Sequence, residues 1–389
     1  MMVKVLVVDD SLVFRKILAE ALGKDPGIRV VGSAANGKEA LQLIRTLRPH
    51  LVVLDVEMPE MDGLQTLDEM RRNRLDAGVI MFSGLTSQGA TTTLEALSRG
   101  AFDFVPKPTG TGAFGESVKR IKDDLIPKIK AYAESRLHRP SLGLGGRVSA
   151  SPLAPARRAI LPVAAKGRLA SSQPVGPQMR PRASTLEVRT CRPFSPEAVA
   201  IGVSTGGPNA LNEVIPRLPR NLGLPVFLVQ HMPPVFTAQL ARRLDDKSPL
   251  KVIEAQDNMP VEANTVYVAP GDFHMEVDGA GKERFIRLNQ GPAVNSVRPA
   301  VDVLFHSIAL TYGGRAIAVV MTGMGQDGFA GCRELKAKGS VVIAQDRETC
   351  VVWGMPKFVT EAGLADRVCP LGGIADSIVE FSRKGAILR

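Results

Sequence analysis

Residues 3–11 read VKVLVVDDS, and this stretch decides how the fold begins. A short apolar run that ends in two acids and a serine predicts a buried strand, followed at once by a helix that Ser11 caps. The helical segment that follows has an apolar face made of Val13, Phe14, Ile17, Leu18 and Leu22. The chain therefore opens with a strand and a helix packed against each other.

The same alternation continues through the first third of the chain. Four more apolar runs predict strands, at residues 28–31, 51–54, 79–82 and 102–105. Strands that alternate with helices form parallel, doubly wound sheets. We therefore expect residues 1–131 to form a five-stranded, flavodoxin-like α/β domain, with its ligands beyond the carboxyl ends of the strands.

Chemically active side chains stand at those carboxyl ends. Asp9 and Asp10 end the first strand, Asp55 the third and Ser83 the fourth, and Lys107 follows the fifth. Carboxylates gathered at one edge repel one another, and a hard divalent cation such as Mg²⁺ would offset that repulsion. One carboxylate could then attack a phosphoryl donor, with Lys107 and the metal balancing the charge. Alternatively, the first two acids only cap the next helix, but this leaves the other residues unexplained.

Residues 1–131 resemble the receiver domain of two-component response regulators. The resemblance rests on residues 9–11, on residues 54–63 (LDVEMPEMDG), and on Ser83, Phe104 and Lys107. It implies that Asp55 is the phosphoacceptor and that Ser83 and Phe104 form the switch pair. It further implies an Mg²⁺ ion held by Asp10, Asp55 and the Glu57 carbonyl group, with Asp9 assisting.

The chain has 389 residues and a net charge of +10, yet this charge is confined to one segment. Residues 136–192 contain eleven Lys or Arg and one acid, which leaves 38 basic and 38 acidic residues elsewhere. This stretch is rich in proline, so we expect residues 132–196 to be a flexible linker. A polybasic tether to acidic lipid or an acidic partner is the alternative. The neutral remainder argues against a nucleic-acid-binding protein.

The compartment is predicted from what the sequence lacks. No apolar run reaches the ~20 residues of a membrane span, and acids interrupt the N-terminus before a signal peptide could form. Four cysteines without a CxxC pair are too few for a disulfide scaffold and do not form a zinc ribbon. We expect a cytoplasmic protein without membrane insertion.

Residues 197–389 again alternate strands and helices, which predicts a second, larger α/β domain. An apolar run at 198–203 leads into Gly202-Val203-Ser204-Thr205-Gly206-Gly207-Pro208 and then a helix. This strand–turn–helix fits a nucleophile elbow with Ser204 as nucleophile. The N–H groups of Thr205, Gly206, Gly207 and Met324 are candidate oxyanion donors. The same glycine-rich turn could instead hold a nucleotide phosphate.

A nucleophilic serine needs a base and an acid that orients the base. His231 follows an apolar run at 224–229, and Asp327 follows another at 315–321, so both should reach the edge that carries Ser204. His274 is expected on a surface strand and His306 in a partly buried helix. Asp327 could instead cap the helix at 329–338. The chain order Ser, His, Asp differs from that of α/β-hydrolases.

This half resembles the catalytic domain of chemotaxis protein-glutamate methylesterases. The motifs that carry the resemblance are IGVSTGGP at 201–208, VQHMP at 229–233, VAPGDFH at 268–274, MTGMGQDG at 321–328, AQD at 344–346 and GMP at 354–356. The resemblance implies a triad of Ser204, His231 and Asp327 and no cofactor in this domain. It implies hydrolysis of glutamate methyl esters and deamidation of glutamines on the cytoplasmic domains of chemoreceptors.

The resemblance also implies regulation. A chemotaxis histidine kinase would be the phosphodonor, and the unphosphorylated receiver would cover the catalytic crevice. Two other classes of output domain fit less well. A DNA-binding output lacks a helix-turn-helix pattern, and a nucleotide-binding output leaves His231 and Asp327 unexplained.

Overall fold

A computed structural model describes residues 2–108, 114–137, 195–281 and 283–383. The predicted linker, 132–196, lies largely outside the described residues. At its start, helix α5 (Phe114–Leu137) continues past residue 131. Within the described ranges, no helix combines the length and apolar character needed to cross a membrane.

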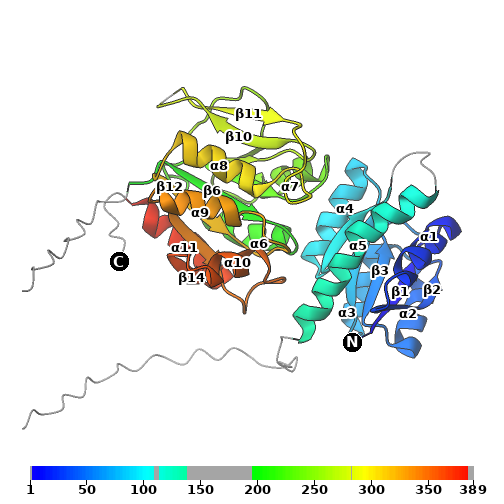
Figure 1. Ribbon diagram of the computed structural model, residues 1–389. Helices are drawn as coiled ribbons and strands as arrows, with labels where there is room; N and C mark the ends of the chain where they lie inside the picture. Colours follow the sequence, from blue (N-terminus) through cyan, green and yellow to red (C-terminus); the bar gives the residue numbers. More distant parts are fainter. Residues whose placement is uncertain (1, 109–113, 138–194, 282, 384–389) are drawn as a thin grey trace, which may run out of the picture. The chain divides into compact units, whose positions relative to one another are not determined.

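The first domain has the predicted five-stranded parallel sheet, with strand order β2-β1-β3-β4-β5 (Figure 1). This order is that of the flavodoxin-like fold, so the predicted fold class is confirmed. The second strand is longer than predicted. The strands are β1 (Val3–Val8), β2 (Ile28–Ala34), β3 (Leu51–Asp55), β4 (Gly78–Ser83) and β5 (Asp103–Pro106).

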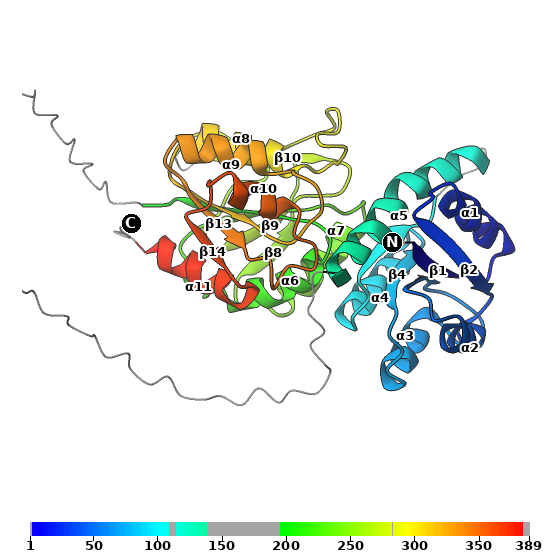
Figure 2. The same cartoon turned by 60° about the horizontal axis from the view of Figure 1, so that its bottom comes forward.

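Helices cover both faces of this sheet. Helix α5 packs beside α1, whereas α2, α3 and α4 pack against one another in chain order (Figures 1 and 2). Ser11 stands at the N-cap of α1 as predicted, but its backbone N–H donates to Asp9 Oδ1 at 2.9 Å and its side chain makes no capping bond. The first four helices are α1 (Leu12–Gly23), α2 (Gly37–Leu47), α3 (Gly63–Arg72) and α4 (Ser87–Ser98).

The second domain contains a seven-stranded parallel sheet of order β14-β13-β12-β6-β7-β9-β8. The first strand, β6, has β7 on one side and β12 on the other. Later strands are therefore added in opposite directions from β6, and the strand order reverses between β6 and β12. Ligands of open α/β sheets bind at such a switch point. The strands are β6 (Ala198–Val203), β7 (Val226–Gln230), β8 (Lys251–Glu254), β9 (Thr265–Val268), β12 (Ala316–Val320), β13 (Val341–Gln345) and β14 (Arg367–Cys369).

Two apolar cores enclose this sheet, one on each face. Alternate β6 residues point to opposite cores, with Val199 and Ile201 on one side and Ala198 and Ala200 on the other. The first core takes side chains from α6, α7 and α11, and the second from α8, α9 and α10. These helices are α6 (Gly207–Val214), α7 (Phe236–Asp245), α8 (Val301–Thr311), α9 (Phe329–Ala337), α10 (Met355–Glu361) and α11 (Leu371–Ser382), with a short 3₁₀ turn η1 (Ile215–Arg217).

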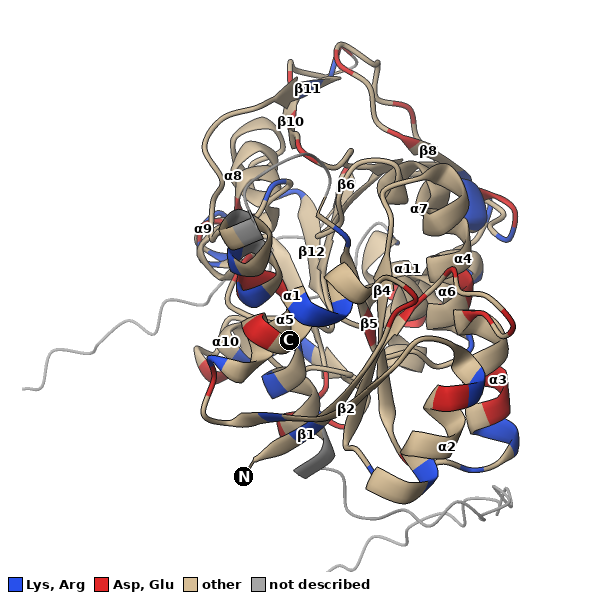
Figure 3. Ribbon diagram, turned by 90° about the vertical axis from the view of Figure 1, so that its right-hand side faces the viewer, with Lys and Arg blue, Asp and Glu red and all other residues tan. Residues whose placement is uncertain are grey.

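An antiparallel hairpin of β10 (His274–Asp278) and β11 (Phe285–Asn289) is added to the parallel architecture. The sequence indicated a surface strand here, but α8 packs against β10 and buries His274, which is 2% exposed. The surface elsewhere mixes charges of both signs. Helix α3, for example, carries both acidic and basic residues (Figure 3), including an ion pair between Glu69 and Arg72.

Candidate functional site

Ser204 lies at the switch point of the larger sheet. It directly follows β6, whose last residue, Val203, is paired with Gln230 of β7. On the other side, the Ser204 backbone N–H donates to the Thr322 carbonyl oxygen at 3.0 Å, just beyond β12. The half-buried serine therefore stands between the ends of two neighbouring strands, as the predicted strand ends required.

Two glycines let the chain turn tightly around this serine. Gly206 has φ +78°, a left-handed conformation that glycine adopts without strain. A Cβ atom at Gly323 would lie 2.8 Å from Ser204 Cβ and 2.3 Å from Met355 Sδ. Only glycine at position 323 therefore allows the loop after β12 to approach the serine this closely.

His231 and Asp327 form a direct pair. Nε2 of His231 lies 2.8 Å from Oδ2 of Asp327, and the two side chains are 10% and 3% exposed. A carboxylate only accepts hydrogen bonds, so Nε2 carries the proton and Nδ1 is the free acceptor. The His231 backbone N–H donates to the Val203 carbonyl oxygen at 3.3 Å, which fixes the histidine on the strand next to Ser204. No hydrogen bond between the described residues joins the Ser204 hydroxyl to the ring.

Asp327 accepts hydrogen bonds from five donors. His231 and the Val301 N–H donate to Oδ2, and Oδ1 accepts from the N–H groups of Asp302 and Gly328 and from Nδ2 of Asn295. Burial alone would raise the pKa of this carboxyl. The bonds from His231 and from the first turn of α8 outweigh burial and lower the pKa below its ordinary value. Asp327 is therefore held as a carboxylate.

The candidate oxyanion donors differ in availability. The N–H of Gly207 donates to the Ser204 carbonyl oxygen at 2.7 Å and is occupied. The N–H groups of Thr205, Gly206 and Met324 donate no hydrogen bond to any described residue. The last of these belongs to the loop that Gly323 brings against the serine, so free N–H groups flank Ser204 on two sides.

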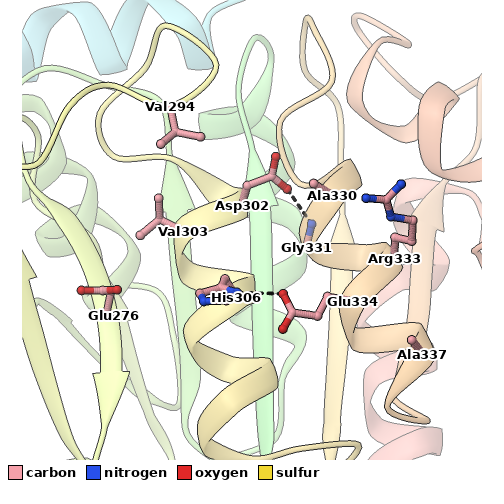
Figure 4. A pocket seen from close by; sticks show the side chains of 10 residues that line it. All are labelled: Glu276, Val294, Asp302, Val303, His306, Ala330, Gly331, Arg333, Glu334 and Ala337. Carbon is pink, nitrogen blue, oxygen red and sulfur yellow. Dashed lines mark hydrogen bonds and ion pairs between the residues drawn. The ribbon is translucent and has the colours of Figure 1, made fainter.

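The other two histidines of this domain lie elsewhere. His274 is buried; its Nδ1 accepts from the Ala300 N–H at 3.2 Å and its Nε2 lies 3.1 Å from the Pro292 carbonyl oxygen. His306 was expected to be partly buried, but its side chain is 55% exposed and pairs with Glu334 on α9. Figure 4 shows this pair joining α8 to α9, and both residues line a pocket.

The smaller domain gathers its predicted residues at the carboxyl edge of its sheet. Carboxylate oxygens of Asp9, Asp10 and Asp55 lie within 4.8 Å of one another. Lys107 Nζ lies 3.0 Å from Asp9 Oδ2 and 2.7 Å from Asp55 Oδ2. Burial, together with the charge of Asp9, raises the pKa of Asp55 to about 6 despite the lysine. The negative charge of the Asp55 carboxylate is therefore not fully balanced by the protein groups around it.

The predicted switch residues lie on the neighbouring strands. The Ser83 hydroxyl, at the end of β4, donates to the Gly89 carbonyl oxygen at 3.3 Å. Phe104 on β5 is 4% exposed and stacks on Phe236, with ring centroids 4.6 Å apart. Glu57 follows β3, and its backbone N–H donates to Asp55.

Comparisons with known proteins show the family to which both domains belong. Residues 199–378 match the family model "CheB methylesterase", and residues 5–119 match "Response regulator receiver domain". A protein-glutamate methylesterase/protein-glutamine glutaminase of a Nocardioides species is 45% identical, over 95% of this chain and 92% of its own. The relative of that name from Desulfotalea psychrophila is 41% identical, over 97% of each chain. The chain belongs to the protein-glutamate methylesterase/protein-glutamine glutaminase family.

Solved structures give a further comparison. The CheB methylesterase catalytic domain of Thermotoga maritima is 48% identical to this chain, covers 48% of it and 99% of its own length, and has a TM-score of 0.47.

Several polar residues around Ser204 were not predicted from the sequence. The buried Thr322 hydroxyl donates to the Thr205 carbonyl oxygen at 3.0 Å and accepts from the N–H groups of Val351 and Val352. The Gln345 side chain accepts from the Thr322 N–H at 2.8 Å. Gln345 belongs to the AQD motif, but no role was predicted for it. Asn295 lies in a loop where no strand end or periodicity marks it.

The carboxylate cluster of the receiver domain fits a magnesium ion. Three carboxylates against one lysine leave two uncompensated negative charges, which a divalent cation would balance. Oxygen ligands from Asp10, Asp55 and the Glu57 carbonyl group, with Asp9 beside them, are of the type that Mg²⁺ prefers. A bound Mg²⁺ would neutralise the charge of an incoming phosphoryl group.

The raised pKa of Asp55 leads to a stability prediction. Its pKa is about 6 in the folded protein and 3.8 as its ordinary value, so folding favours the protonated acid. Stability is therefore lost as the pH rises through this window. Asp55→Asn should raise the free energy of unfolding of the metal-free protein at neutral pH by about 1–3 kcal/mol. Thermal melting in a chelator measures this.

Magnesium provides the control for this variant. Added Mg²⁺ should raise the melting temperature of the receiver in the unmodified protein and much less in Asp55→Asn. A variant that melts lower than the unmodified protein, or an equal response of both to Mg²⁺, would contradict the assignment.

Proposed function

We propose that this chain is a phosphorylation-activated serine hydrolase. It demethylates glutamate methyl esters and deamidates certain glutamines on the cytoplasmic domains of methyl-accepting chemoreceptors, and a chemotaxis histidine kinase phosphorylates it at Asp55. Family membership supports the reaction, and the 2.8 Å pair between His231 and Asp327 beside Ser204 carries the mechanism. We place this reaction in the cytoplasm, where the receptor glutamates and the kinase are both present.

The proposed reaction begins with a proton transfer within the triad. With Nε2 donating to Asp327, His231 accepts the Ser204 proton at Nδ1 while the serine oxygen attacks the ester carbonyl carbon. Rotation of the serine hydroxyl on substrate binding supplies the missing contact, since such bonds are often loose before substrate binds. Asp327 stabilises the imidazolium that forms.

The negative charge that develops on the carbonyl oxygen needs donors. The free N–H groups of Thr205, Gly206 and Met324 are the candidates, with the N-terminus of α6 directly behind them. The tetrahedral intermediate collapses as His231 gives its proton to the departing methoxide, and methanol leaves. The product is a glutamyl ester on Ser204.

Hydrolysis of this acyl-enzyme restores the site. His231 takes a proton from a water molecule, the hydroxide attacks the ester carbonyl carbon, and the proton returns to the Ser204 oxygen as glutamate leaves. A glutamine side chain reacts by the same steps, with ammonia in place of methanol.

Regulation by the receiver is supported by contacts between the two domains, which belong to one compact unit. The Thr205 hydroxyl, next to the proposed nucleophile, donates to Asp103 Oδ2 at 2.8 Å. Asp103 begins β5 and precedes Phe104, which stacks on Phe236. A phosphoryl group on Asp55 would compete for Lys107 and Ser83, and a consequent shift of β5 would break both contacts. We infer that the unphosphorylated receiver restrains the nucleophile loop.

Removal of the receiver should therefore activate the enzyme. A chain that lacks residues 1–137 is expected to demethylate receptors about 5–100-fold faster than the unphosphorylated full chain, the range of a typical coupling energy. Methanol release measures this. Thr205→Val, which keeps the backbone and removes the hydroxyl that bonds to Asp103, should raise the activity of the unphosphorylated full chain. Equal or lower activity of the shortened chain would count against inhibition by the receiver.

Mass spectrometry of a methylated receptor fragment tests the proposed reaction. Incubation with the full chain, Mg²⁺ and a small-molecule phosphodonor should remove methyl groups from glutamate esters and convert particular glutamines to glutamates. A fragment that keeps every methyl ester while the receiver is phosphorylated would refute the proposal.

A further inference from the structure

Asn295 joins two carboxylates at the rear of the site. Its side-chain nitrogen Nδ2 donates to Asp327 Oδ1 at 2.8 Å and to Asp302 Oδ2 at 2.9 Å. An amide NH₂ group has two hydrogens, and both are used here. The reverse orientation would put the amide oxygen against two carboxylates, so the chemistry of the neighbours fixes which way the amide points.

Asp302, the second carboxylate bonded to Asn295, is itself held by a further hydrogen bond. Asp302 Oδ1 accepts from the Gly331 N–H at 2.8 Å, which ties the first turn of α8 to the first turn of α9 (Figure 4). Burial raises the pKa of Asp302, and the charge of Asp327 adds to this effect. Asn295 lies between the two acids and donates to both, which offsets their mutual repulsion.

We propose that Asn295 is a positioning residue for the hydrolytic reaction. Its amide holds Oδ1 of Asp327 and so turns Oδ2 toward His231. The amide also draws electron density from the carboxylate, which limits how strongly the carboxylate raises the basicity of the imidazole. This inference rests on the proposed triad and adds to it a residue from the loop before α8.

The backbone at this position allows a clean test. Asn295 has φ +53°, in the left-handed region, where asparagine is tolerated and glycine meets no steric strain. Asn295→Gly therefore deletes the amide and keeps the backbone conformation. Asn258 offers a matched control: it has φ +61°, its Nδ2 donates to Asp257 Oδ2 at 2.9 Å, and it bonds to none of the triad residues.

We expect Asn295→Gly to lower kcat for demethylation about tenfold, with little change in KM, since a hydrogen bond to a charged group is lost. The acid limb of the pH–kcat/KM profile, assigned to His231, should move to higher pH. The charged groups facing that ring in the network are Asp327 and, behind it, Asp302. Asn258→Gly should leave both the rate and the profile unchanged.

Asn295→Asp separates position from charge. The aspartate keeps the shape of the side chain but places a third carboxyl group between two others. The acid limb of the pH–kcat/KM profile should therefore again move to higher pH. Wild-type kinetics and pH profile in Asn295→Gly, measured beside an active unmodified enzyme, would overturn the inference, as would a lower rate with an unshifted profile. An inactive unmodified enzyme would instead refute the proposed function.

Discussion

Ser204→Ala is expected to lower kcat/KM for receptor demethylation by about 10⁴–10⁶-fold, because the acyl-enzyme can no longer form. The residual rate would come from the oxyanion donors and from substrate binding. The fold should survive, since the Ser204 hydroxyl makes no hydrogen bond to another described side chain and the turn is held by its backbone. Methanol release and thermal melting of the same sample separate lost chemistry from lost structure.

A matched serine variant controls for the substitution itself. Ser382, at the end of α11, donates to the Val379 carbonyl oxygen and lies far along the chain from the catalytic motifs. Ser382→Ala should keep its activity. If Ser204→Ala released methanol at more than about a tenth of the unmodified rate, a role as nucleophile would be untenable.

Asp327→Asn is expected to reduce kcat by about 10³–10⁴-fold at neutral pH. Oδ1 of Asp327 accepts from three fixed N–H donors, whereas one of the two donors to Oδ2 is His231, which can change its tautomer. The amide NH₂ group is therefore expected on the side that faces His231. The His231 proton would then move from Nε2 to Nδ1, the nitrogen that must accept the serine proton. The substitution changes few atoms, yet it reverses the tautomer on which the base depends.

The controls for this variant address charge and folding. Asp246→Asn makes the same chemical change at an exposed position after α7 and should keep full activity. Melting curves show whether Asp327→Asn remains folded. A folded variant with a rate within about fivefold of the unmodified enzyme would rule out Asp327 as the orienting acid.

Much of this architecture could be predicted because parallel sheets place strand ends together. Asp55, Ser204 and His231 each follow an apolar run, so one rule located all three at sheet edges. The second strand was underestimated because residues 32–34, Gly-Ser-Ala, interrupt the apolar pattern of an edge strand. The strand β10 was predicted without its partner β11, and it was assigned to the surface because its burial depends on α8, which follows later in the chain.

Contacts that depend on the path of a loop could not be predicted, because loops show no periodic pattern of apolar residues in the sequence. Asn295 bonds to Asp327 only because the loop before α8 lies against the loop that follows β12. His274 was assigned to the surface, but the Ala300 N–H at the start of α8 bonds to it. The burial of His274 therefore depends on tertiary packing. The roles proposed for Ser204, His231 and Asp327 remain predictions that kinetic measurements will test.

A fluorophosphonate probe tests the central claim most directly, because it reacts covalently with an activated serine. The full chain is incubated with the probe, with and without Mg²⁺ and a phosphodonor, and digested for peptide mass spectrometry. The account predicts a single adduct on Ser204, formed faster after phosphorylation, and no adduct in His231→Ala. An enzyme that demethylates receptors while Ser204 stays unlabelled, or that is labelled at another serine, would contradict it.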